Sequence, residues 1–184
     1  MLRPLSILLV ASAAACLGAP ATFAADPPST AAAPSTRPAV STDAFLAKLS
    51  VGNKFEIDSS KLALSRSKSE IVKTFASQMV SDHGQAAVKM KQAVTDAKVK
   101  APADAVDAKH QAMLDDLKKK DGPAFDQAYV DAQLKGHEET VAMFEAYSTT
   151  GDNPRIKQFA SDLLPTLRMH LDNVKKLQAS AGKS

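Results

Sequence analysis

The segment from Ser67 to Lys98 constrains the fold more than any other part of the chain. Its apolar residues recur every three or four positions, which is the spacing of one face of an α-helix. This face consists of Val72, Phe75, Met79, His83, Ala86, Met90 and Ala93. A stripe this wide must be buried against other elements. The segment therefore predicts a helix inside a bundle, with the imidazole of His83 in the middle of its buried face.

The same spacing predicts four more helices. Three are long and cover about residues 42–64, 123–147 and 154–177, and a shorter one covers residues 104–120. The run from Ser67 to Glu70 has the sequence of a capping box and is expected to open the second helix. Asn153 is expected to cap the last helix, which Pro154 opens and which Pro165 should kink or restart. The fold class is therefore all-α.

The lengths of the connections indicate how the helices are arranged. They run short, long, short, which predicts two antiparallel helical hairpins joined by a crossover that carries the extra short helix. Among four-helix bundles, one long crossover is typical of the ferritin-like arrangement. A weak internal repeat at an offset of 84 residues, in which 72–80 matches 156–164, agrees with duplication of one hairpin.

The N-terminus has the features of an export signal. Arg3 precedes an apolar run over residues 5–17, which is too short to span a bilayer, and Ala24 ends a signal-peptidase site. We expect a signal peptide over 1–24, a disordered linker rich in Pro, Ala, Ser and Thr over 25–41, and a bundle over 42–180. These features predict a periplasmic or secreted protein whose mature chain has no transmembrane helix. Cys16 leaves an alternative open, in which the chain is an envelope lipoprotein with a lipid anchor.

The charge pattern excludes one class of partner. The net charge is +3, and the lysine clusters at 118–120 and 175–176 have no aromatic residues among them. A nucleic-acid surface combines basic and aromatic side chains, so we expect no nucleic-acid binding. The sequence does not identify a protein partner.

Each long helix places one metal-ligating residue type on its inward face. The four residues are Glu56, His83, His137 and His170. The offset of 84 puts them at similar depths in the bundle, so they are expected to converge on one layer. Three imidazoles and a carboxylate suit one zinc, copper or non-haem iron ion. The alternative is a buried hydrogen-bond network without metal, which fixes the register of the helices. His110, on the crossover helix, is expected at the surface.

Methionines and carboxylates near the four candidate ligands give weaker indications of a metal site. The thioethers of Met79, Met143 and Met169 favour Cu(I), although methionine in a helical core usually fills gaps. Asp82 and Glu138 adjoin two of the histidines and can accept an imidazole N–H, although solvated carboxylates are the simpler interpretation.

Several motifs together resemble a known family. They are Gly-x-x-x-Glu56, Phe-Ala-x-x-Met-Val-x-Asp-His83, Phe125-Asp-x-x-Tyr129, and Leu-Pro165-x-x-x-x-His170-Leu. Over about residues 42–177 the chain resembles the exported bacterial proteins of the domain-of-unknown-function 4142 family. This resemblance implies a ferritin-like bundle in the envelope, and it implies no activity.

Two kinds of motif are absent from the sequence, and their absence limits the metal sites and reactions that we expect. The di-iron ferritins use Glu-x-x-His on two helices, but Val80 and Leu167 stand three residues before His83 and His170. A single ion is therefore expected rather than a di-iron centre. No nucleophile–base pair or phosphate loop is visible, so whether the protein is an enzyme stays open. The competing function is a metal-free structural or interaction protein of the cell envelope.

Overall fold

The computed structural model describes residues 40–181. The predicted signal peptide over 1–24, Cys16, and all but the last two residues of the predicted linker over 25–41 lie outside the described residues. Within that range the chain forms five α-helices and no β-strand, which confirms the all-α class. None of these helices contains a segment long and apolar enough to cross a membrane.

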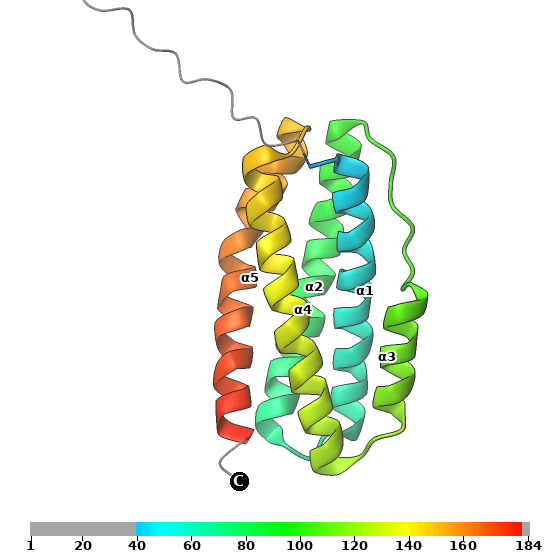
Figure 1. Cartoon of the computed structure of the whole chain (residues 1–184), viewed down its shortest axis with the longest axis vertical. Coiled ribbons are helices and arrows are strands. Elements are labelled where there is room, and N and C mark those ends of the chain that lie inside the picture. The colour runs from blue at the N-terminus through cyan, green and yellow to red at the C-terminus, as the bar shows by residue number, and fades with distance from the viewer. Residues whose placement is uncertain (1–39, 182–184) are drawn as a thin grey trace, which may run out of the picture. The chain divides into compact units, whose positions relative to one another are not determined.

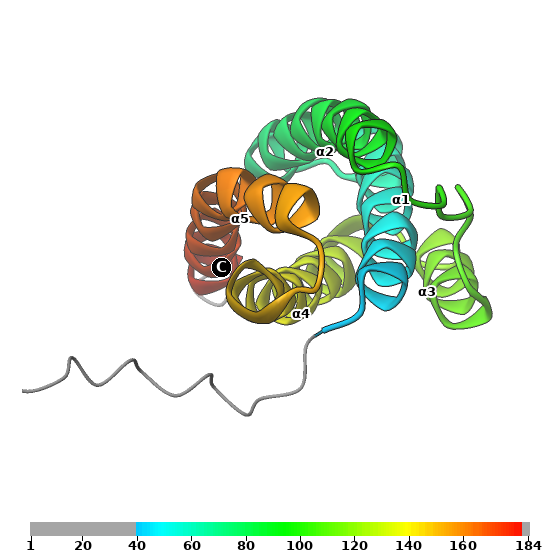
Figure 2. The ribbon, with the colours of Figure 1, turned by 90° about the horizontal axis from the view of Figure 1, so that it is seen from above.

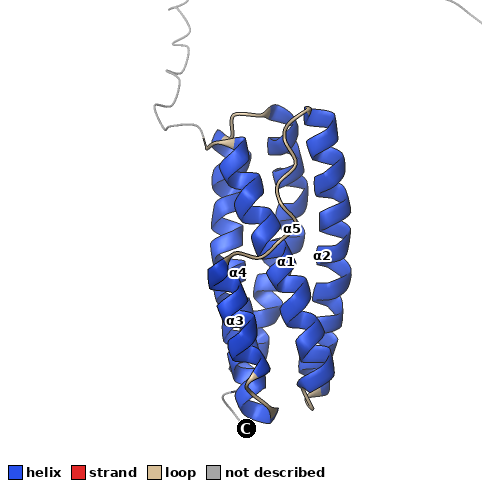
Figure 3. Cartoon of the chain, turned by 90° about the vertical axis from the view of Figure 1, so that its right-hand side faces the viewer, coloured by secondary structure: helices blue, strands red, loops and turns tan. Residues whose placement is uncertain are grey.

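Four long helices lie side by side, and one short helix packs outside them (Figure 1). The helices are α1 (Thr42–Arg66), α2 (Glu70–Ala97), α3 (Ala108–Lys118), α4 (Gly122–Thr150) and α5 (Pro154–Ala181). Each long helix contacts two others, α1 with α2 and α4, and α5 with α2 and α4. The view from above shows the resulting closed ring, with α3 against the outside of α1 (Figure 2). The long connection after α2 carries the chain to α3 (Figure 3).

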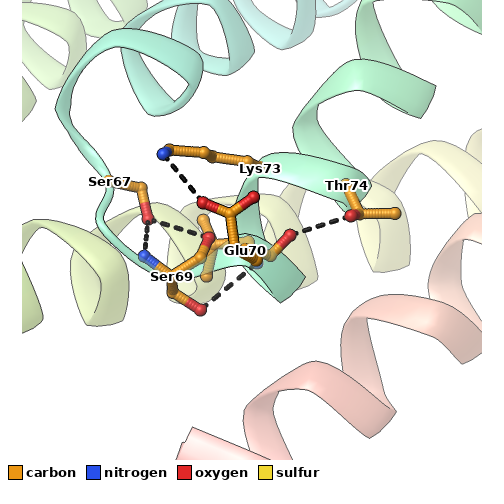
Figure 4. Close-up of polar contacts among 6 residues, drawn as sticks. Ser67, Ser69, Glu70, Lys73 and Thr74 are labelled. Carbon is orange, nitrogen blue, oxygen red and sulfur yellow. Dashed lines mark hydrogen bonds and ion pairs between the residues drawn. The ribbon is translucent and has the colours of Figure 1, made fainter.

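The start of α2 corrects the predicted capping box. The N-cap is Ser69, whose hydroxyl accepts a hydrogen bond from the N–H of Val72 at 3.4 Å. Ser67 lies two residues earlier, where its hydroxyl accepts from the N–H of Ser69 at 3.1 Å (Figure 4). The Glu70 side chain bonds Lys73 at 3.0 Å instead of turning back to the cap. Ser67 thus shapes the turn between α1 and α2, and Ser69 begins the helix.

The other helix ends follow from local residue chemistry. The Asn153 side chain accepts from the N–H groups of residues 155 and 156, so its predicted role as a cap is confirmed. The crossover helix begins at Ala108, later than predicted, because Asp107 caps it by accepting from the N–H of His110 at 2.8 Å. Pro165 lies within the unbroken helix α5, so the predicted restart is not observed.

The interior consists of two apolar clusters separated by a polar layer. One cluster contains Phe45, Phe144 and Ile156, and the other contains Phe75 and Phe125. The buried polar side chains between them are Asn53, Glu56, Ser59, Ser60, His83, Gln133, His137 and His170. Burying so many polar groups costs free energy unless each finds a partner, so this layer is where a function is to be sought.

The residues just before α1 are fixed to the turn between α4 and α5. The N–H of Val40 donates to the carbonyl of Thr150 at 3.2 Å, and the carbonyl of Val40 accepts from the N–H of Asp152 at 3.4 Å. The hydroxyl of Thr42 bonds both the Asp152 carboxylate and the buried hydroxyl of Tyr147. These contacts join the two hairpins at one end of the bundle.

Candidate metal centre

The four residues singled out from the sequence each come from a different long helix. Glu56 is on α1, His83 on α2, His137 on α4 and His170 on α5. All four are buried, with exposed fractions of 5%, 6%, 1% and 1% respectively. They belong to the polar layer between the two apolar clusters. The four side chains therefore lie at one level of the bundle, as expected. The three imidazoles form a close group, and the carboxylate lies beside it.

The three imidazoles form a nearly equilateral triangle. Their ring centroids are 5.5 to 5.6 Å apart. One ring nitrogen from each histidine lies within 4.8 Å of one from each of the others. The centre of a triangle with 4.8 Å sides lies about 2.8 Å (4.8/√3) from its corners, and imidazole nitrogen binds zinc at about 2.0–2.1 Å. A shift of less than about 1 Å per side chain would bring three nitrogens to one ion.

One nitrogen of each ring is held by an oxygen. His83 Nδ1 is 3.0 Å from Asn53 Oδ1, and His137 Nδ1 is 2.9 Å from the backbone carbonyl of Gln133. His170 Nε2 is 2.9 Å from Asp82 Oδ2. An oxygen acceptor holds the N–H on the nitrogen it faces, which leaves the lone pair on the other nitrogen. Metal-binding histidines are oriented by carbonyl and carboxylate acceptors of this kind.

The second nitrogen of each ring has no hydrogen-bond partner among the described residues. These atoms are His83 Nε2, His137 Nε2 and His170 Nδ1. Buried side-chain nitrogens without partners are rare in proteins, and one explanation for them is a bound ion. Three such nitrogens on neighbouring rings provide three lone pairs that one metal ion could bind.

The pKa values of these imidazoles are low because of where they lie. Burial lowers the pKa of His137 to about 4. The pKa of His83 is well below its usual value, mainly because of burial and to a smaller extent because His137 and His170 lie close by. Burial also lowers the pKa of His170, against the opposing effect of Asp82. All three rings are therefore neutral at pH 7, which is the form of imidazole that binds metal ions.

Glu56 lies beside the triangle and is not one of the three groups that come within 4.8 Å of one another. Its Oε1 is 4.0 Å from His137 Nδ1, and its Oε2 has no hydrogen-bond partner. The carboxyl lies over Gly136, where an added Cβ would be 2.7 Å from Oε1. Burial raises the pKa of Glu56 to about 8. This acid is therefore mostly protonated at pH 7.

Two adjoining cavities lead toward the polar layer. An outer chamber of about 660 Å³ lies between α1, α3 and α4, and an inner cavity of about 30 Å³ reaches His83. Lys48, Gly52, Glu56 and Thr140 line both. The inner cavity is large enough for one water molecule or one small ligand atom. The polar layer is thus buried but not sealed from the side of α1 and α4.

The remaining residues considered in the sequence lie apart from the triangle. Met79 is buried in an apolar cluster, Met143 is half-buried, and Met169 is 42% exposed. Glu138 is exposed. His110 is half-buried rather than at the surface, because it packs edge-on against the ring of Phe55, 5.2 Å away.

Sequence reasoning did not assign three residues that hold the imidazoles. Asn53 and Gln133 received no role, and Asp82 was expected in solvent although it bonds His170 across two helices. Asn53 has a signal in the sequence, because it is a polar residue on an inward helical face and aligns with His137 at the offset of 84. The group that holds His137 is the backbone carbonyl of Gln133, which a residue of any type at that position would supply.

Comparisons with known proteins bear on the fold and the family. Two solved structures of CopM, in the Cu(II)-bound and Ag-bound forms, are 16% and 18% identical to this chain. They have TM-scores of 0.64 and 0.61, and each alignment covers 77% of this chain and 98% or 97% of CopM. A DUF305 fragment from Deinococcus radiodurans is 14% identical with a TM-score of 0.65, and the match covers 78% of this chain and 99% of the fragment. These likenesses show the helical fold alone.

Family membership follows from the sequence itself. A search of curated protein sequences found no match. The model of one family, described as a domain of unknown function, matches residues 27–177, which is most of the chain and includes all four residues of the candidate site. The chain therefore belongs to the DUF4142 family.

Proposed function

We propose that this protein binds one transition-metal ion through His83, His137 and His170. The observation that carries the proposal is the set of three buried ring nitrogens without partners, on imidazoles whose other nitrogens are held by oxygens. A network built only for packing would satisfy both nitrogens of each ring, since an unpartnered buried polar atom costs free energy. Here each ring is held on one side and left free on the other.

Glu56 supplies a fourth ligand in this proposal. Its Oε2 has no partner, and the carboxyl adjoins the His137 ring. To ligate the ion, the side chain must rotate from the side of His137 Nδ1, which it adjoins, toward the side of the free Nε2. Carboxylates ligate an ion in their ionised form, so binding of the ion releases a proton from Glu56. Three imidazoles and one carboxylate are a donor set for zinc, copper or non-haem iron.

Copper is the first ion to test. The described forms of CopM contain Cu(II) and Ag, and CopM has the same helical fold. Imidazole donors bind Cu(II) more tightly than the other divalent ions of the first transition row. The thioether of Met79 is in a neighbouring apolar cluster, so the site is one of nitrogen and oxygen donors.

The protein acts outside the cytoplasm in this proposal. Residues 1–24 serve as a signal peptide and residues 25–41 as a linker before the bundle, which we assign to the ferritin-like four-helix class. The mature protein is periplasmic or secreted, or, if Cys16 is acylated, an envelope lipoprotein. Sequestering or sensing one ion in that compartment is the role that the buried site supports.

The test is metal content and affinity of the purified protein. We expect one Cu(II) per chain by elemental analysis after dialysis, with nitrogen hyperfine coupling in the electron paramagnetic resonance spectrum. His83→Ala, His137→Ala and His170→Ala should each lose the ion. His110→Ala is the matched control, because His110 is the fourth histidine of the chain and lies outside the triangle.

Two outcomes would refute the proposal. The first is the same copper content in the three triangle variants as in wild type. The second is wild-type protein that binds no copper, zinc or iron, and this result would favour the metal-free structural protein. Circular dichroism of each variant identifies those that have failed to fold, and the spectrum of the wild-type complex reports its nitrogen ligands independently of them.

A further inference from the structure

The outer chamber has the size and lining of a small-molecule site. Its volume of about 660 Å³ lies in the usual range of ligand pockets, about 300–1,000 Å³. The apolar part of its wall comes from Val51 and Phe55 on α1, Met113 on α3 and Met143 on α4. Such a wall favours a ligand with an apolar body.

The charged residues of the chamber favour an anion. Lys48, Lys109 and Lys135 line it, and none of the three makes an ion pair with another described residue. The acids that line it, besides Glu56, are Asp107 and Glu139. Asp107 already accepts from both the backbone N–H and the ring of His110, at 2.8 and 2.6 Å. Three unpaired ammonium groups face two ionised carboxylates, those of Asp107 and Glu139, and Glu56 is mostly protonated, so the lining keeps a small positive balance.

The chamber and the inner cavity share part of their lining, and we call this shared boundary the passage at Gly52. Gly52 lines both the chamber and the inner cavity, and an added Cβ at Gly52 would meet nothing within 4 Å. The inner cavity is bounded by His83 and by Glu56, whose Oε2 has no partner. With the three imidazoles and Glu56 bound, a further ligand would take a fifth position on the ion. Of the three imidazoles, the inner cavity borders that of His83.

We propose that the outer chamber binds a small organic anion with an apolar body, and that an oxygen of its negative group reaches the ion across the passage at Gly52. The apolar body lies against Phe55 and the methionines, and the lysines attract the negative group. The second half of this inference rests on the proposed function, because it needs an ion at the triangle. The first half concerns the metal-free protein alone.

Benzoate is the probe, and two titrations separate the two halves. On metal-free protein, saturation-transfer NMR and calorimetry measure benzoate binding. Benzylammonium has the same ring with the opposite charge and should bind at least about tenfold more weakly. On cobalt-loaded protein, benzoate should change the visible absorption of Co(II) with the same saturation curve.

Two glycine variants provide a matched pair. Gly52→Leu puts a side chain into the passage and the chamber wall, and benzoate should bind at least about tenfold more weakly to it. Gly84→Leu is the control: Gly84 is also helical, an added Cβ there also meets nothing within 4 Å, and it lines neither cavity. It should bind benzoate as wild type does. Both variants remove a helical glycine, so any effect of helix propensity is shared.

The outcomes that overturn the inference differ from those that overturn the proposed function. Equal benzoate affinity of the Gly52→Leu variant and wild type, or equal affinity for benzylammonium, refutes the anion site. Saturable benzoate binding without a change in the cobalt spectrum refutes the passage to the ion. Protein that takes up no metal refutes the proposed function, and the metal-free titration still tests the chamber.

Discussion

Replacing Glu56 with Gln tests how far burial in the polar layer raises the pKa of this carboxyl group. In the metal-free protein, burial raises the pKa of Glu56 from 4.5 to about 8. Above pH 4.5 the unfolded chain loses this proton, while the folded protein keeps it. The folded state therefore binds more protons, and stability falls as pH rises until the folded protein also titrates near pH 8. Gln cannot ionise, so the variant lacks this loss.

The size of the effect follows from the width of the pH window. Each pH unit over which only the unfolded state is deprotonated costs about 1.4 kcal/mol. Between pH 5 and pH 8 the cost to wild type amounts to about 3 to 4 kcal/mol, less than three full units because titration is partial at both ends. We expect the free energy of unfolding of Glu56→Gln, minus that of wild type, to be larger at pH 8 than at pH 5 by this amount.

Subtracting the free energy of unfolding of wild type from that of the variant cancels the contributions of the other titratable groups. The buried histidines have lowered pKa values, so they lower the stability as pH falls below about 6.5, and they do so in both proteins. Any fixed cost of the Gln amide is the same at both pH values. The assay is urea unfolding followed by circular dichroism with a chelator present, extrapolated to water. A difference below about 1 kcal/mol between the two pH values would show that burial does not keep Glu56 protonated.

Three further predictions concern single side chains. Asp82→Ala removes the acceptor that orients His170 and should weaken metal binding by about 10–100-fold in a chelator competition titration, whereas Glu138→Ala, at an exposed position, should leave it unchanged. Phe144→Ala empties a fully buried site in one apolar cluster and should lower the free energy of unfolding in urea by about 3–5 kcal/mol; a loss below 1 kcal/mol would contradict the packing described. Ser69→Ala removes the cap of α2 and should cost about 1 kcal/mol in the same assay, and no loss would mean that the cap contributes nothing.

The helices could be predicted because apolar spacing records burial directly. Val72, Phe75 and Met79 recur at helical intervals, and all three are buried. The helix starts are less well determined, because neighbouring residues compete for one role. Ser67 and Ser69 both suit an N-cap, and only the path of the turn decides between them.

The meeting of the three histidines could be predicted from their register, and the groups around them could not. Register fixes depth along a bundle, so His83 and His170 were expected at one level. Side-chain rotamers and the pairing of α2 with α5 decide that Asp82 bonds His170 rather than its neighbour in sequence. The outer chamber depends on where α3 packs against α1, and the long crossover leaves that position free.

The two apolar clusters draw residues from both hairpins, and this has a consequence for assembly. Phe45 on α1 packs with Phe144 on α4, and Phe75 on α2 lies near Tyr129 on α4. Each hairpin shares both clusters with the other, so a hairpin released by cleavage of the crossover would expose the apolar surface that the other covers. The polar layer is made from all four long helices, so it forms only when the two hairpins are packed together.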